Sequence, residues 1–246
     1  MRTLQIPIWT WYLNIIEFMA QIYTYAFFKL PSETIELPLG IEGQLDLVVS
    51  SENVAALVEP NLSSTEFQVS DQRLMRAVLS HDRVIRDMFH QIDALLPLRF
   101  GTCFVSHDGL VEHIKAHSQT YLETLSMLSG KAEYTLKLIP TDIKEQTDSQ
   151  SPRGRDYFLA KKRQYQTIAH QKQNQEAERD RLLNEIRHLY PSMVRSDASE
   201  EVERLYILCD RQAESTLSQQ VQQWQATCSM WTLSLGDALP PYHFVE

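Results

Sequence analysis

The stretch RLMRAVLSHDRVIRDMFHQIDALLPLRFGTCF, residues 73–104, decides the fold that the sequence predicts. It predicts one amphipathic helix that leads directly into one buried strand. Apolar side chains recur in the helical part at spacings of three and four, which places them on one face. The residues of this face are Leu74, Val78, His81, Ile85, Met88, Phe89 and Ile92. The charged residues Arg73, Arg76, Arg83 and Asp87 fall on the opposite side.

Both ends of this helix have sequence signals. Ser70 or Asp71 can cap the first turn, where free backbone N–H groups need an acceptor. Pro97 is expected to end the helix, because its ring and the residue before it reject helical geometry. Alternation after Pro97 then predicts a strand from Leu98 to Phe104.

The elements before this helix are mainly strands. Gln21–Leu30 is rich in Tyr and Phe and predicts a strand, followed by a connection without helical period up to Gly43. Alternation predicts a hairpin made of residues 45–49 and 54–58. The order strand, connection, hairpin, helix, strand is ferredoxin-like, with the first helix reduced or missing.

The second half of the chain predicts a similar order. A helix over 106–129 ends at Gly130, and a strand over 133–139 follows. A long helix is expected from about Arg153 to Tyr190, and its polar middle, Gln171–Arg181, should project into solvent or contact a partner. A strand over 203–210, a helix with Leu217 and Trp224 on one face, and a last strand over 230–235 complete the chain.

The sequence therefore predicts an α+β protein of two domains. Each domain is expected to be a modified ferredoxin-like antiparallel sheet with helices packed on it, and the C-terminal one carries a long, partly projecting helix. The expected boundaries are an N-terminal extension over residues 1–19, a first domain with a trailing helix over 20–129, and a second domain over 130–246.

Composition excludes several classes of function. The net charge of −9 argues against a nucleic-acid-binding protein, which needs concentrated Lys and Arg. With only 7 glycines, the chain contains no glycine-rich phosphate loop. The three cysteines Cys103, Cys209 and Cys228 are odd in number and widely spaced, which favours a reducing compartment and buried, unpaired thiols.

Six segments of the sequence resemble, in the same order, the gas vesicle protein F/L family. RAVLSHDRVI and LPLRFGTCF lie in the opening stretch, and the other four are YTYAFF (23–28), AALVEP (55–60), GKAEYTLKL (130–138) and PPYHF (240–244). The resemblance covers about residues 20–245. One departure is the closing GDALPPY, where the family has GPWPPY, so any role of that tryptophan does not transfer.

The resemblance implies a minor, non-enzymatic component of gas vesicles within the cytoplasm. Such a protein is expected to bind the hydrophobic shell protein, gas vesicle protein A, and to support nucleation and assembly of the shell. Other gas vesicle proteins are further candidate partners. The resemblance implies no catalytic, cofactor-binding or metal-binding residue.

The first residues form an apolar segment that the family resemblance does not include. Thr3–Ile16 carries no charge, but Pro7, Asn14 and Glu17 interrupt the apolar character, and the run is too short to span a membrane. Translation starting upstream of Met19 is the preferred explanation. Membrane attachment through Ile6–Phe18 is the alternative.

Three groups of residues suggest chemistry, and each has a simpler explanation. Ser80, His81 and Asp82 are neighbours on a helix and point about 100° apart, so they cannot form a triad. His81 is instead expected to be a hydrogen-bonded core residue. His113 and His117 share a helix face, as a zinc pair would, but no third ligand is nearby. Cys103 and His107 lack a third catalytic member.

Partner binding is assigned to two sets of residues. Arg73, Arg76 and Arg83 could receive an acidic partner, and Tyr23 and Tyr25 belong to a strand whose free edge could add a strand of the shell protein. Met230–Leu235 is the second candidate edge. The alternative function is a small-molecule-binding regulatory domain or an enzyme on a ferredoxin-like fold, with a pocket gathering His81, Arg99 and Cys103.

Overall fold

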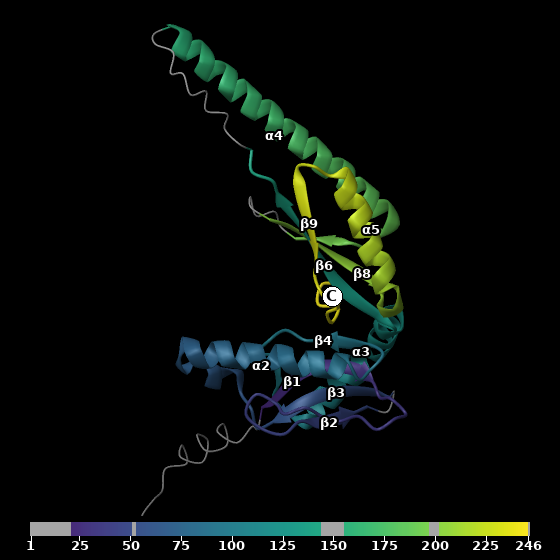
Figure 1. The fold of residues 1–246 in the computed structure, drawn as a ribbon. Helices are drawn as coiled ribbons and strands as arrows, with labels where there is room; N and C mark the ends of the chain where they lie inside the picture. The colour runs from purple at the N-terminus through teal and green to yellow at the C-terminus, as the bar shows by residue number, and fades with distance from the viewer. Residues whose placement is uncertain (1–20, 51–52, 144–154, 197–201, 246) are drawn as a thin grey trace, which may run out of the picture. The chain divides into compact units, whose positions relative to one another are not determined.

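The structure is a computed structural model that describes residues 21–50, 53–143, 155–196 and 202–245. The chain forms two compact units, and each is described by itself (Figure 1). The first unit contains the chain up to Lys131 and also residues 239–246, and the second contains residues 132–238. The expected extension over residues 1–19 lies outside the described residues.

The first unit is built on an antiparallel sheet with the strand order β2-β3-β1-β4 (Figure 1). The strands are β1 (Ile22–Lys29), β2 (Asp46–Val49), β3 (Val54–Pro60), β4 (Leu95–Pro97) and the short β5 (Cys103–Phe104), which also pairs with β1. Asn53 has a positive φ of 65° in the turn between β2 and β3. The predicted hairpin is therefore present.

Helix α2 (Asp71–Phe89) ends earlier than the sequence predicts. The Ser70 hydroxyl accepts the Arg73 N–H at 3.3 Å, which confirms one of the two expected caps. The predicted end at Pro97 is wrong, because Leu95, Leu96 and Pro97 pair with β1 as strand β4. Pro97 is tolerated there since β4 is an edge strand, where a missing N–H removes no ladder hydrogen bond.

The predicted strand 98–104 is also wrong as a continuous element. Only Cys103–Phe104 pairs, as β5, and residues 98–102 loop away between β4 and β5. Two backbone bonds hold this loop to β1: Leu98 N–H donates to the Tyr25 carbonyl at 2.8 Å, and Thr24 N–H donates to the Thr102 carbonyl at 2.9 Å.

Strand β1 is covered on both faces. Residues 23–28 are all buried, and the register with β3 shifts between Thr24 and Ala26. Tyr23, before the shift, and Tyr25, at the shift, pack against His81 of α2. Phe27, after the shift, stacks on Tyr121 of helix α3 (His107–Leu128) at 4.9 Å between ring centroids. The sheet is thus enclosed between α2 and α3.

The connection from β1 to β2 contains no helix and is held by one buried carboxylate. Glu59 of β3 is 2% exposed. Its Oε2 accepts the Ile41 N–H at 2.7 Å, and its Oε1 accepts the N–H groups of Glu42 at 2.8 Å and of Gly43 at 2.5 Å. These bonds satisfy backbone groups that a helix would satisfy internally.

The second unit has the element order β-α-β-β-α-β and the strand order β7-β8-β6-β9. Its strands are β6 (Lys131–Pro140), β7 (Val194–Arg195), β8 (Glu203–Asp210) and β9 (Trp231–Leu235), and its helices are α4 (Arg155–Leu189) and α5 (Glu214–Thr227). The sequence did not predict β7. Tyr134, Leu136 and Leu138 of β6 are buried on one face, while on the other face Glu133 is buried and Lys137 and Ile139 are exposed.

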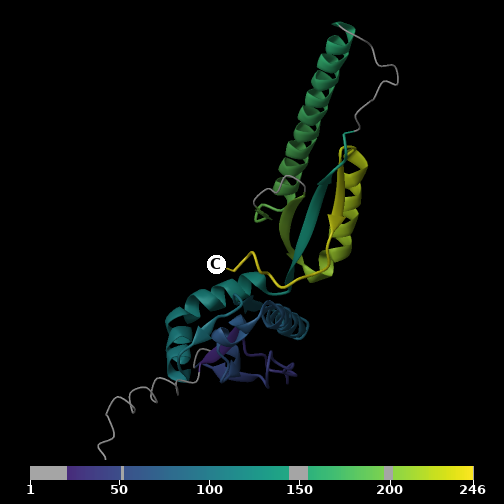
Figure 2. The same ribbon diagram turned by 90° about the vertical axis from the view of Figure 1, so that its left-hand side faces the viewer.

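Helix α4 extends well beyond its sheet (Figures 1 and 2). The prediction that its polar middle projects is wrong, because that middle binds the strand ends. Gln175 donates to the carbonyls of Thr141 at 3.1 Å and of Met230 at 3.0 Å, and Glu178 accepts the Met230 N–H at 2.8 Å. The projecting part is instead the first third, with Phe158 and Tyr165 exposed.

The C-terminal segment departs from the expected domain assignment. The sequence placed residues 239–246 in the second domain, and in the structure they group with the first unit. The Tyr242 hydroxyl donates to the Asp82 carboxylate of α2 at 2.6 Å. A single side-chain contact between residues 160 positions apart is not visible as a sequence pattern.

Candidate partner-binding site

His81 is a core residue with both ring nitrogens bonded. The side chain is buried against Tyr23, Tyr25 and Phe100, whose ring centroids lie 5.2–5.7 Å away. Nε2–H donates to the Leu98 carbonyl at 3.1 Å, and Nδ1 accepts the Tyr23 hydroxyl hydrogen at 2.9 Å. The expectation of a hydrogen-bonded core histidine is confirmed.

The buried surroundings of His81 and Tyr23 favour the neutral forms of both side chains. Burial lowers the pKa of His81, because a charged imidazolium is poorly solvated there. Burial also raises the pKa of Tyr23, whose hydroxyl accepts the Gly101 N–H at 3.1 Å. A neutral histidine whose two nitrogens are already engaged has no free position for a substrate proton.

The pair His113 and His117 is bonded within α3. The His113 Nε2 lies 2.8 Å from the Tyr121 hydroxyl, and the His117 Nδ1–H donates to the His113 carbonyl at 2.8 Å. In the described parts of the chain, no group of three or more His, Cys, Asp or Glu side chains is placed to hold a metal ion. The pair therefore serves the packing of α3 beside Phe27.

The three cysteines differ in burial. Cys228 is buried, as predicted, while Cys103 and Cys209 are half-buried. The Cys103 Sγ lies 4.0 Å from the Leu62 carbonyl oxygen and makes no hydrogen bond with His107, whose Nδ1 faces Asp108 at 3.6 Å. The structure does not bring Cys103 and His107 together.

The three arginines predicted to bind a partner differ in their contacts. Arg73 pairs with Glu42 at 3.1 Å, and Arg83 pairs with Asp87 at 3.1 Å and donates to the Leu39 carbonyl at 2.6 Å. Arg76 is exposed, and the described residues provide no ion pair for it. Two of the three arginines thus serve the fold of the first unit.

Tyr23 and Tyr25 are not available to a partner. Both side chains are fully buried, and β1 lies between β3 and β4 in the sheet. The predicted free edge at Tyr23–Phe28 is therefore wrong. The sequence shows that the strand is aromatic, but a strand's position in a sheet is set by pairing with distant segments.

An exposed apolar surface lies on the first half of α2, and it includes two residues that the sequence assigned to the core. Leu74 and Val78, predicted as buried, are each 38% exposed, and Met75 and Leu79 are 61% and 62% exposed. Together with the exposed Val69 just before the helix, these residues form what we call the α2 apolar patch. The buried side chains of α2 begin only at Ala77 and continue to Phe89.

Polar groups border the α2 apolar patch on the next turn of the helix. Asp82 accepts from Tyr242 and pairs with Arg86 at 2.7 Å. An apolar centre with a polar rim is the usual composition of a protein-binding surface. A sequence signal existed: Met75 and Leu79 lie four residues apart, outside the predicted core face, and two large apolar residues there widen the stripe beyond what one sheet covers.

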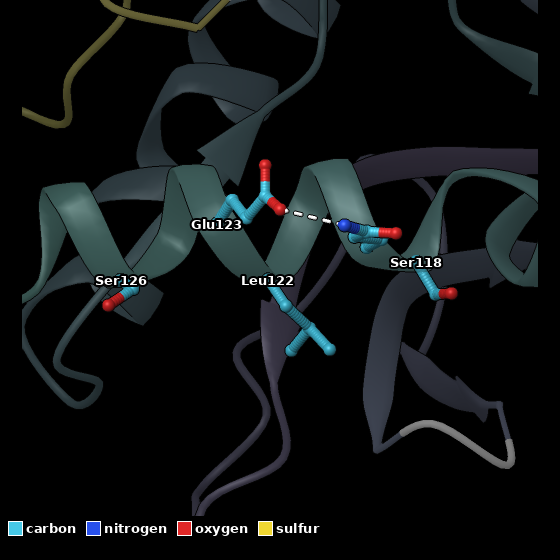
Figure 3. Close-up of a pocket in the computed structure, with 5 residues that line it drawn as sticks. Ser118, Leu122, Glu123 and Ser126 are labelled. Atoms are coloured by element: carbon cyan, nitrogen blue, oxygen red, sulfur yellow. Dashed lines mark hydrogen bonds between the residues drawn. The ribbon is translucent and has the colours of Figure 1, made fainter.

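A shallow hollow on α3 is a weaker candidate. Ser118, Gln119, Leu122, Glu123 and Ser126 line it, all from one helix, and Figure 3 shows Leu122 pointing away from the helix. The Gln119 amide donates to the Glu123 carboxylate at 3.0 Å. Because one helix supplies every lining residue, the hollow offers no converging groups for chemistry.

Comparison with known proteins places the chain in a family. The family model described as gas vesicle synthesis protein GvpL/GvpF matches residues 21–246. The chain belongs to the GvpL/GvpF family. The match begins one residue before β1 and includes both units and the C-terminal segment. The family resemblance seen in the sequence is confirmed.

Two solved structures of GvpF share the fold of this GvpL/GvpF-family chain. GvpF from Anabaena sp. PCC7120 is 18% identical, with a TM-score of 0.69 over 92% of this chain and 96% of that one. GvpF from Microcystis aeruginosa is 20% identical, with a TM-score of 0.65 over 92% of this chain and 99% of that one. No curated protein matches the sequence significantly.

Among the described helices, none is both long and apolar enough to cross a membrane. Within the described ranges, two antiparallel sheets and four long helices make this an α+β protein, as predicted.

Proposed function

We propose that this chain is a non-enzymatic assembly component of gas vesicles that binds gas vesicle protein A through the α2 apolar patch. The proposal places the chain in the gas vesicle, within the cytoplasm, where it supports nucleation and assembly of the shell. The exposure of Met75 and Leu79 beside Leu74 and Val78 on one helix is the observation that carries it.

The chemistry of the α2 apolar patch suits a hydrophobic partner. Shell subunits expose apolar surface before they assemble, and such surface aggregates unless a partner covers it. Burying Met75 and Leu79 contributes about 1.5–3 kcal/mol per side chain, which makes them candidate anchors. The ion pairs of Arg73 and Arg83 neutralise two of the three cations beside the patch, which lowers the cost of bringing an apolar segment close to them.

The other candidate docking site, the edge strand β9, is partly protected. Its Leu233 N–H donates to the Gln225 side chain at 2.7 Å, so that edge position is already satisfied. The Trp231 indole N–H donates to the Gln175 carbonyl at 2.9 Å, which also joins this strand to α4. We therefore favour α2 over β9 as the first contact with the shell protein.

Both units fit one modified ferredoxin-like plan within this proposal. In each sheet the second strand lies at one edge, and the third strand separates it from the first. In the first unit, the connection between β1 and β2 takes the place of the first helix, and its backbone N–H groups donate to Glu59. In this interpretation each unit is a separate domain that offers its own surface, with the boundary near Gly130.

The alternative of an enzyme or small-molecule site has no support at the position where it was expected. The His81 ring is enclosed by aromatic side chains, Arg99 is exposed, and Cys103 lies beside the Leu62 carbonyl. These three residues do not line a common pocket in any of the hollows that we describe.

Co-purification of the full chain with gas vesicle protein A tests the proposal. The double variant Met75→Asp/Leu79→Asp should retain at least tenfold less shell protein than the original chain, because carboxylates would have to be buried in the contact. Val105→Asp is the matched control, since Val105 is equally exposed at 61% but lies outside α2. Absence of association for the original chain at every salt concentration, or full retention by the double variant, contradicts the proposal.

A further inference from the structure

The projecting part of α4 carries exposed aromatic and basic side chains. Phe158 is 74% exposed and Tyr165 is 62% exposed. They lie seven residues apart, and Ala169 follows after four more, so all three fall on one side of the helix. Phe158, Lys161, Lys162, Tyr165, Gln166 and Ala169 line a shallow hollow along this side. We call the surface formed by these six residues the α4 aromatic row.

This aromatic row does not face the sheet of its own unit. The half-buried positions in this part of the helix are Gln164, Ile168, Gln171 and Gln175, which follow a different stripe. Gln175 on that stripe makes the bonds to Thr141 and Met230. Among the described side chains of α4, Leu182, far along the helix, is the first buried one. Phe158 and Tyr165 are therefore not needed for the packing of the second unit.

The charge of this segment is opposite to that of the chain. Between residues 155 and 172, five lysines and arginines stand against the single acidic residue Asp156, a net charge of +4 in a chain of −9. Lys161 lies 5.8 Å from the centre of the Tyr165 ring, which holds its ammonium group beside the row. The described residues provide no ion pair for Lys161, Lys162 or Arg163, unlike Arg73 and Arg83 of α2.

We propose that the α4 aromatic row binds an acidic amphipathic helix of another protein. Apolar residues of that helix would pack between Phe158 and Tyr165, while its carboxylates would pair with Lys161 and Lys162. A convex helix surface cannot enclose an extended peptide, but it can pack side by side with a second helix. Cations around exposed aromatic residues, for which the described residues provide no ion pair, specify the sign of the partner's charge.

The charge and the shape of the surface disfavour other anionic partners. A nucleic acid would be repelled by the remaining acidic surface of the chain. A lipid surface requires a broad, continuous apolar face. Here Gln164, Gln166 and Thr167 flank Tyr165, and the exposed Tyr157 and Leu159 point about 100° away from Phe158 on either side of the helix. This proposal does not depend on the α2 apolar patch, and the two can be tested separately.

Two labelled synthetic peptides of about 18 residues test the proposal by fluorescence anisotropy with the full chain. One peptide has leucines at helical spacing and glutamates elsewhere, and the other has lysines in place of the glutamates. The acidic peptide should bind at least tenfold more tightly than the basic one, and added salt should weaken its binding. Absence of binding by the acidic peptide, or equal binding of both, overturns the proposal.

Variants of the full chain locate the binding. Lys161→Glu/Lys162→Glu and Phe158→Ser/Tyr165→Ser should each weaken binding of the acidic peptide at least tenfold. Lys115→Glu on α3 is the matched charge control and should bind as the original chain does, and so should Met75→Asp/Leu79→Asp. All these side chains are exposed, so the variants are expected to fold, and far-ultraviolet circular dichroism checks this. Unchanged binding by both α4 variants, or α4-dependent binding to vesicles containing phosphatidylserine, overturns the proposal.

Discussion

The Tyr25 hydroxyl donates to the Glu59 carboxylate at 2.5 Å, from the position in β1 where the register with β3 shifts. The same Glu59 oxygen accepts the Ile41 N–H, and the other oxygen accepts the N–H groups of Glu42 and Gly43. Burial, followed by the hydrogen bond to Glu59, raises the pKa of Tyr25 well above its usual range. One buried carboxylate thus joins the centre of the sheet to the connection that replaces a helix.

Replacement of Glu59 should destabilise the first unit more than replacement of its tyrosine partner. Glu59→Gln substitutes an NH2 group for one acceptor oxygen, so buried N–H groups of the connection lose their partner, and we expect a loss of about 2–3 kcal/mol in the free energy of unfolding. Tyr25→Phe leaves the three backbone donors in place and should cost about 1–2 kcal/mol. Urea denaturation measures both, and a larger loss for Tyr25→Phe would contradict this account.

Glycine is required at position 40 because Glu59 occupies the space of a side chain. A Cβ on Gly40 would collide with the Glu59 carboxylate and would also lie 2.9 Å from Leu45 Cδ2. Gly40→Ala should therefore lower the free energy of unfolding by about 1–3 kcal/mol. Gly43→Ala is the matched control, since its Cβ would meet Glu59 Oε1 at 3.4 Å, an ordinary contact. Equal stability of the two variants in urea would show that the connection moves freely.

The first unit should lose stability on acidification through His81. The folded-state pKa of His81 lies below its ordinary value of 6.5, so between these two pKa values the unfolded chain binds more protons. Stability is therefore expected to fall as the pH drops below about 6.5, until the pH passes the folded-state pKa. The melting temperature at several pH values between 7.5 and 5 measures this loss.

His81→Gln should flatten that dependence on pH, because glutamine keeps polar atoms and does not titrate. Part of the dependence should remain, since burial also lowers the pKa of His113. Identical slopes for the original chain and for His81→Gln would mean that His81 is not the group whose protonation opposes folding.

The polar middle of α4 should hold the end of β9 in place. Glu178→Ala removes the acceptor of the Met230 N–H, and we expect faster hydrogen exchange at Met230 together with a loss of about 0.5–1.5 kcal/mol. Glu176→Ala is the matched control, because Glu176 is an exposed neighbour on the same helix. Unchanged exchange at Met230 in Glu178→Ala would show that Gln175 alone maintains the contact.

The sequence predicted only part of the candidate binding surface on α2. The sequence identified the family and the basic stripe of α2, but two residues of the α2 apolar patch, Leu74 and Val78, were assigned by the same pattern to the core. Periodicity reports which side of a helix is apolar. It does not report how much of that side a sheet covers, because coverage depends on where distant strands end.

The sequence by itself determined the elements with strong local signals. The helix cap at Ser70, the terminating Gly130 with its positive φ of 69°, the alternation of β6 and the core position of His81 all follow from patterns within about ten residues. Such patterns reflect backbone conformation and amphipathic spacing, which neighbouring residues decide.

Only the tertiary structure decided which elements lie inside and which remain exposed. It placed aromatic β1 at the centre of its sheet, converted Leu95–Pro97 from helix to strand, and bound the polar middle of α4 to the strand ends. It also joined residues 239–246 to the first unit through Tyr242 and Asp82. Each outcome depends on pairing between segments far apart in the chain, and the free energy of such pairing is not encoded in local spacing.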